Sequence, residues 1–270
     1  ANTTGSHQTA SGFEALKSVA TTSFNTAYGS QALKVAVADS CVAVGAQSLV
    51  ACTSGAGNTA VGRDSMGATT TGANNVAVGK SALFANTTGS ENTALGTDAL
   101  KANTTAANNV AVGYYSGQAN TTGTANASLG AYSFYTNTTG ANNTALGYGT
   151  LKVNTTASNN TAVGKDALAA NTTGHSNTAV GTNALLVNTT GTTNVALGMN
   201  TLKSNTTGGY NTALGEGSAL ANTTASNNTA VGQTALRFNT TGNNNVAVGK
   251  DALYSNTTGA HNVCIGKDSG

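Results

Sequence analysis

One glycine position recurs every 17 residues through most of this 270-residue chain, and it constrains the fold more than any other feature of the sequence. Gly181 is a typical member of the series, which runs at regular steps from Gly45 to Gly266. Gly12 and Gly29 extend it toward the N-terminus, with one step of 16 residues before Gly45, so that 16 copies occupy almost the whole chain. A fixed period of this length is typical of a solenoid, in which each repeat forms one coil and is buried only by stacking on its neighbours.

The repeat predicts a single array over residues 1–270, although the length alone would suggest one or two globular domains. Residues 1–44 hold degenerate N-terminal coils, in which Gln8 replaces the usual Asn, whereas residues 45–270 form regular 17-residue coils. No linker or charge run interrupts the pattern. The sequence begins and stops within a repeat, and we therefore expect the array either to continue in a longer protein or to stack end to end on further copies.

Charge and hydropathy exclude several classes of partner. Charged residues make up 7% of the chain and the formal net charge is +2, which is too small for an electrostatic footprint on nucleic acid or anionic lipid. No apolar run approaches the ~18 residues of a membrane span. A polar composition of this kind would ordinarily favour disorder, but a disordered chain has no reason to keep an apolar register.

The residues of one coil can be numbered from the recurring glycine, here called the marker glycine. Asn stands at −4 and Ala at −2 in 14 of the 16 copies, Val, Leu or Ile at −1 in 14, and Leu at +4 in 11. The run N-T-A-V-G predicts a short strand, and A-L-x-x-N predicts a second, weaker one. Glycine at positions 0 and +10 predicts two bends, and alanine at some +10 sites indicates that this second bend does not require a positive φ. The sequence therefore predicts an all-β, parallel β-solenoid (β-roll) of about 16 coils.

Asparagine recurs at two positions of the coil, −4 and +7. We expect each to stack on its counterpart in the next coil, so that the side-chain amides hydrogen bond along the axis. Asn86 and Asn103 also begin N-x-T sequences that match glycan acceptors. A repeat that needs an Asn-Thr-Thr corner generates such sequences automatically, and this structural explanation is favoured.

The alternation of small and branched residues in the strand leaves two arrangements open. If Val at −1 faces the interior, Ala at −2 faces outward, where a second chain could approach closely. In the other arrangement Ala faces a narrow interior and Val faces a partner. We favour the first, in which the following alanines line an interface between copies of the chain: Ala60, Ala77, Ala94, Ala111, Ala145, Ala162, Ala179, Ala196, Ala213, Ala230 and Ala247.

The strand sequences resemble those of a known family. Residues 75–79, NVAVG, and 245–249, also NVAVG, look like the NSVAIG-type repeat of trimeric autotransporter adhesin heads. The full unit, as in residues 143–156, is also similar to the repeat shafts of phage tail-fibre-like proteins. The resemblance implies a left-handed parallel β-roll, a homotrimer, and a location outside the cell on a cell or virion surface.

Nothing in the sequence indicates catalysis or a cofactor. His7, His175 and His261 occupy equivalent corners of well-separated coils and do not converge into one site. Neighbouring Lys and Asp residues after the marker glycine, such as Lys165 and Asp166, are typical of a solvated corner, where an ion pair contributes ~0–1 kcal/mol. No metal-ligand spacing is present. We therefore predict a protein that is not an enzyme and that uses no metal or cofactor.

Aromatic residues gather in one part of the chain, and positions +1, +2 and +5, where most of them lie, otherwise carry charged residues and should face outward. We expect an exposed patch that contacts a carbohydrate or a protein receptor, formed by Tyr114, Tyr115, Tyr132, Tyr135 and Tyr148. The alternative is a local repacking around Gly117, which removes the usual Leu at +4.

The three cysteines, Cys41, Cys52 and Cys264, are interpreted as small buried residues of a packed array. A disulfide between Cys41 and Cys52 is an open alternative, because its geometry cannot be judged from sequence.

These features predict a non-enzymatic, extracellular structural or adhesive fibre that assembles as a trimer, as a head-to-tail filament, or as both. The alternative is an ice-binding solenoid, because Thr at +8 and +9 recurs on successive coils. A polysaccharide-processing β-helix would need clustered carboxylates, and the 9 acidic residues are spread over the coils.

Overall fold

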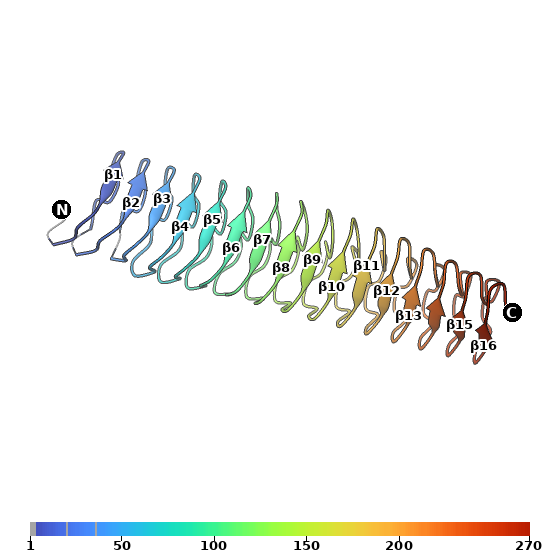
Figure 1. Cartoon of the computed structure of the whole chain (residues 1–270). Coiled ribbons are helices and arrows are strands. Elements are labelled where there is room, and N and C mark those ends of the chain that lie inside the picture. The colour runs from blue at the N-terminus through green and yellow to red at the C-terminus, as the bar shows by residue number, and fades with distance from the viewer. Residues whose placement is uncertain (1–3, 20, 36) are drawn as a thin grey trace. The chain divides into compact units, whose positions relative to one another are not determined.

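The computed structural model describes residues 4–19, 21–35 and 37–270. The chain divides into two compact units, Ala1–Thr139 and Gly140–Gly270, and the 17-residue pattern continues unchanged through this boundary. Within the described ranges there is no helix, and each coil contributes one strand of three residues (Figure 1). The predicted all-β solenoid with a 17-residue coil is confirmed.

The strands coincide with positions −3 to −1 of the repeat. In the first unit they are β1 (Thr9–Ser11), β2 (Thr26–Tyr28), β3 (Val42–Val44), β4 (Thr59–Val61), β5 (Val76–Val78), β6 (Thr93–Leu95), β7 (Val110–Val112) and β8 (Ala127–Leu129). In the second unit they are β9 (Thr144–Leu146), β10 (Thr161–Val163), β11 (Thr178–Val180), β12 (Val195–Leu197), β13 (Thr212–Leu214), β14 (Thr229–Val231), β15 (Val246–Val248) and β16 (Val263–Ile265).

Within each unit, every strand pairs in parallel with its neighbours in sequence, and equivalent positions of the repeat lie opposite each other. In the second unit Thr161 of β10 pairs with Thr178 of β11. The one coil that is shorter by a residue keeps the same register, because Tyr28 of β2 pairs with Val44 of β3. The deletion is therefore absorbed by the bends, and side chains of one position form a continuous column along each sheet.

The second, weaker strand is absent from the described coils, so this prediction was wrong. The residues after the marker glycine form successive turns instead. The physical reason is that Ala184 at +3 and Leu185 at +4 are both fully buried, whereas consecutive residues of a strand would point to opposite faces. Leu185 reaches the interior by adopting a φ of 50°, and its N–H still donates to the carbonyl oxygen of Thr201 in the next coil, at 3.0 Å.

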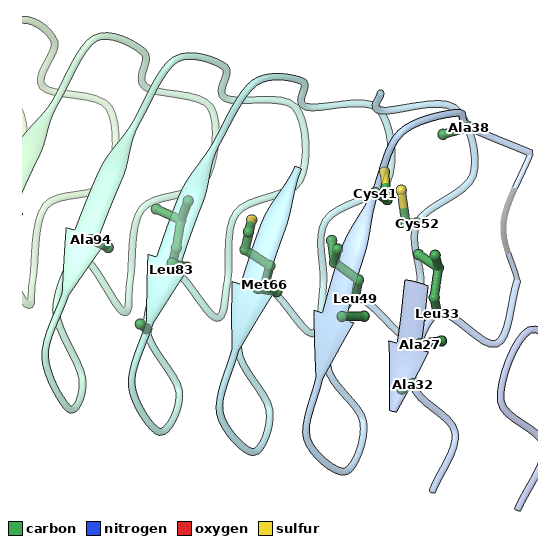
Figure 2. Close-up of a cluster of buried hydrophobic side chains, with 14 of the residues drawn as sticks. Ala27, Ala32, Leu33, Ala38, Cys41, Leu49, Cys52, Met66, Leu83 and Ala94 are labelled. Carbon is green, nitrogen blue, oxygen red and sulfur yellow. The ribbon is translucent and has the colours of Figure 1, made fainter. Parts of the chain in front are cut away.

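The alanines at −2 point into the coil, so the favoured arrangement of the strand was also wrong. Each of them is 0% exposed within the single chain and cannot contact a second copy: Ala60, Ala77, Ala94, Ala111, Ala145, Ala162, Ala179, Ala196, Ala213, Ala230 and Ala247. Figure 2 shows why: the interior is narrow, and Leu49, Met66 and Leu83 at +4 fill it from the opposite wall. Opposite a Leu or Met there is room only for a methyl group, and Val at −1 is therefore directed outward.

Two buried columns of asparagine join successive coils as expected. At −4, the Oδ1 atom of Asn177 accepts the backbone N–H of Asn194 at 2.9 Å, and its Nδ2 atom donates to the carbonyl oxygen of Gly191 at 2.9 Å. At +7, the Nδ2 atom of Asn188 donates both to Oδ1 of Asn171 and to the same Gly191 oxygen. Both columns therefore converge on the +10 carbonyl, where the chain bends.

Candidate functional site

The surface that distinguishes each unit is its outward strand face, defined here as the side chains at −3 and −1 of the strands. Position −3 is Thr, Val or Ala throughout, and position −1 is Val, Leu or Ile in every strand from β3 to β16. None of the strand residues that the structure describes is charged. Solvent-facing positions of a strand normally vary and include charged residues, which also protect a sheet from association.

The apolar side chains of the outward strand face remain accessible in the isolated chain. In the second unit Val180 is 36% exposed and Leu197 is 39% exposed, and these two residues lie opposite each other in register. Comparable side chains repeat at the strand spacing and form a ribbon of two parallel columns, one of Thr and Val at −3 and one of Val and Leu at −1. Such a ribbon can bury apolar area against another flat surface with little change in conformation.

Position −3 carries a signal for this face in the sequence itself. Position −3 never varies beyond small or branched uncharged residues, and that restriction has no cause inside the coil, because the side chain points away from it. The alternative arrangement, with Ala inside and Val outside, predicted this surface.

Four of the five predicted tyrosines come together in the first unit. The ring centroids of Tyr115 and Tyr132 lie 5.7 Å apart, and Tyr114 and Tyr135 contact this pair at 4.0 to 6.0 Å. Tyr114 is 45% exposed, and its hydrogen bond with Tyr115 raises the pKa of its hydroxyl group above the ordinary value. Tyr148 lies in the second unit and is also exposed.

The rings of this tyrosine cluster, Tyr114, Tyr115, Tyr132 and Tyr135, pack mainly edge to face or tilted. Tyr114 is exposed and the other three residues are partly buried, and a tilted aromatic cluster of this kind suits a ligand that has both apolar and hydrogen-bonding groups. The interior changes at the same place, since Gly117 and the buried Phe134 stand at +4 of adjacent coils. Exposed rings and altered packing therefore occur together.

The charged corners carry local ion pairs. Nζ of Lys165 lies 3.8 Å from Asp166, and the Lys250–Asp251 pair has the same separation, with well-exposed lysines in both. Nδ1 of His175 lies 3.3 Å from the hydroxyl group of the neighbouring Ser176. Among the residues that the structure describes, no three His, Cys, Asp or Glu side chains gather as metal ligands would.

The threonine columns differ in what their hydroxyl groups can offer. At +8 the Oγ1 atom of Thr172 donates to the carbonyl oxygen of Thr189 in the next coil at 3.0 Å, and the regular coils repeat this bond. At +9 Thr173 and Thr190 are exposed. The +9 hydroxyl groups therefore lie outside the column of hydrogen bonds that the +8 hydroxyl groups form.

No family model and no curated protein sequence matches the chain, so the comparison with known proteins assigns it to no family. The described residues include no helix with the length and apolar character needed to span a membrane.

Proposed function

We propose that this protein is a non-enzymatic structural or adhesive fibre component, outside the cell on a cell or virion surface, whose coils associate with further copies of the chain. The observation that carries the proposal is the outward strand face, a long uncharged ribbon that a solitary soluble solenoid has no reason to keep. Side-by-side packing of such ribbons, as in a trimer, would bury Val and Leu side chains while the Thr residues between them supply hydroxyl groups. Head-to-tail filaments remain a second mode of assembly.

The tyrosine cluster provides the adhesive part of this proposal. Tyr114 is exposed and the other three rings are partly buried, at corners that elsewhere carry Lys, Asp or Thr, and an aromatic group held on a rigid scaffold binds without a large loss of side-chain entropy. A carbohydrate or a protein receptor is the partner that this surface fits.

The assembly proposal predicts that lysine on the outward strand face weakens self-association. In a variant with Val180→Lys and Leu197→Lys, two charges would have to be buried without partners, at a cost of several kcal/mol. We expect association at least about 100-fold weaker, measured by sedimentation velocity over a concentration series. Circular dichroism should stay unchanged, because both positions point away from the core.

The matched control places the same charges on an exposed corner of the same coils, with Thr190→Lys and Thr207→Lys. This variant should associate like the original chain. Equal association of all three proteins would remove the outward strand face from the assembly.

Ice binding is the second candidate, because +9 threonines repeat at the coil spacing on the surface. A regular array of hydroxyl and methyl groups on a rigid scaffold is the kind of surface that orders water. Because the +8 hydroxyl groups donate to the next coil, the +9 threonines, which lie in a bend and not in the sheet, form a single column, and we therefore rank ice binding below the fibre. We expect no thermal hysteresis in concentrated solutions of the protein, and measurable hysteresis with shaped ice crystals would favour ice binding instead.

A further inference from the structure

Two cysteines occupy both asparagine positions of a single coil. Cys41 stands at −4 and Cys52 at +7 of the coil marked by Gly45, and both side chains are fully buried. Their Sγ atoms lie 3.4 and 3.3 Å from the same atom, the carbonyl oxygen of Gly55. Figure 2 shows the two sulfur atoms side by side at one end of the coil interior. The fold therefore brings the two thiols together, although eleven positions separate them in sequence.

A regular coil shows what the pair replaces. There the Nδ2 atoms of Asn75 and Asn86 both donate to the carbonyl oxygen of Gly89, each at 2.9 Å. In the cysteine coil, the Gly55 oxygen receives an amide donor from Asn58 of the following coil at 2.8 Å. A thiol is a weak donor, and this carbonyl is already satisfied by an amide. Hydrogen bonding to Gly55 is therefore not a sufficient reason for two thiols at this place.

The surroundings make the two sulfur atoms chemically different. The neighbouring Cys52 thiol, together with the nearby backbone N–H groups of Asn58 and Gly57, lowers the pKa of Cys41 to about 7, against the opposing effect of burial. The proximity of Cys41, together with burial, raises the pKa of Cys52. Cys41 is thus the sulfur that is more easily deprotonated, and the thiolate is the attacking species in disulfide exchange.

We propose that Cys41 and Cys52 form a disulfide that links the two sides of this coil when the chain folds in the presence of a low-molecular-weight disulfide, before the coil buries both thiols. The Cys41 thiolate attacks one sulfur of the oxidant, which forms a mixed disulfide and releases one thiolate. Cys52 then loses its proton and attacks the Cys41 sulfur, which expels the second thiolate. Both protein thiols are oxidised, the oxidant is reduced to two thiols, and these carry away the two protons.

The position of the disulfide gives it a structural purpose. The −4 column is interrupted at Cys41 between Asn25 and Asn58, and the +7 column holds Thr69 in the following coil before asparagine begins at Asn86. A covalent link would replace the missing amide bonds at the point where both columns lapse. It would stabilise the first coils of the array in an oxidising environment and leave them weaker in a reducing one.

The test uses the full chain, refolded with a mixture of oxidised and reduced glutathione and then digested with trypsin under denaturing, thiol-blocked conditions. Both cysteines fall in one tryptic peptide, because it is bounded by Lys34 and Arg63 with no basic residue between them. We expect this peptide to lack two hydrogen atoms and to resist alkylation, while Cys264 is alkylated. Full alkylation of Cys41 and Cys52, or a link from either to Cys264 or to another chain, would overturn the proposal.

Hydrogen exchange separates the covalent clip from incidental oxidation. Closing a loop of this size removes unfolded-state entropy, and we expect amide exchange in residues 41–58 to slow about 100-fold on oxidation. The Cys52→Ser variant should instead stop at the mixed disulfide of Cys41 with glutathione and show no such slowing. An oxidised and a reduced original chain that exchange equally would contradict the proposed purpose even if the variant fails to fold.

Discussion

Replacing Gly181 with alanine is expected to destabilise the coils around it by at least about 3 kcal/mol. Two independent costs produce this effect. Gly181 has a φ of 134°, which L side chains rarely adopt, and an added Cβ atom would lie 2.5 Å from the carbonyl oxygen of Gly198 in the next coil. Backbone strain and overpacking each cost about 1–3 kcal/mol, and here the neighbouring backbone is held in the ladder and cannot withdraw. Urea denaturation and hydrogen exchange of residues 164–198 measure the loss.

The matched control is Gly174→Ala, at the +10 bend of an adjacent coil. Gly174 has no positive φ, and other coils already carry Ala157 or Ala225 at this position. An added Cβ atom would lie 2.3 Å from the Gly191 oxygen, so the bend must shift, and Ala157, which likewise precedes a glycine at +10 of the next coil, shows that the bend can do so. We expect a change below about 1 kcal/mol. Equal losses in the two variants would show that the marker glycine is not selected by its backbone geometry.

The second large effect is expected for Asn177→Leu, which removes one link of the −4 column while keeping the branched shape and the number of heavy atoms of the side chain. The backbone N–H of Asn194 would lose its partner in a site that excludes water, whereas the carbonyl oxygen of Gly191 would keep the amide donor of Asn188. A buried group without a partner costs about 1–3 kcal/mol, so we expect a loss of about 2–3 kcal/mol. The unfolding midpoint in urea measures it, and exchange of the Asn194 amide should accelerate most.

His175→Leu is the control, because it introduces the same residue at an exposed corner two positions earlier. Its stability should lie within about 0.5 kcal/mol of the original chain. If Asn177→Leu is equally mild, the asparagine columns contribute nothing beyond packing.

Much of the coil could be predicted because its residues repeat a local rule. The strand at −3 to −1, the glycine at 0, the relaxed bend at +10 and the two asparagine columns all follow from residue type and period. A column of asparagine, in particular, has few roles apart from hydrogen bonding along the axis. These predictions needed no knowledge of the width of the coil.

The remaining features depend on that width. The strand pattern alone does not distinguish whether Ala179 or Val180 faces inward. Leu185 decides it, because its side chain occupies the interior opposite the strand. Leu185 in turn reaches the interior only through a φ of 50°, which residue preferences argue against. The absence of the second strand and the inward direction of the −2 alanines thus share one cause. The stacked coils impose a positive φ on leucine, a residue that rarely adopts it.

Cryo-electron microscopy of the protein at working concentration, with mass photometry on the same sample, tests the proposed assembly most directly. We predict discrete oligomers of three chains, or filaments containing them, in which the Val and Leu side chains of the outward strand face lie against a neighbouring copy. Particles that are single chains at every concentration, or oligomers in which this face is turned to solvent, would contradict the account.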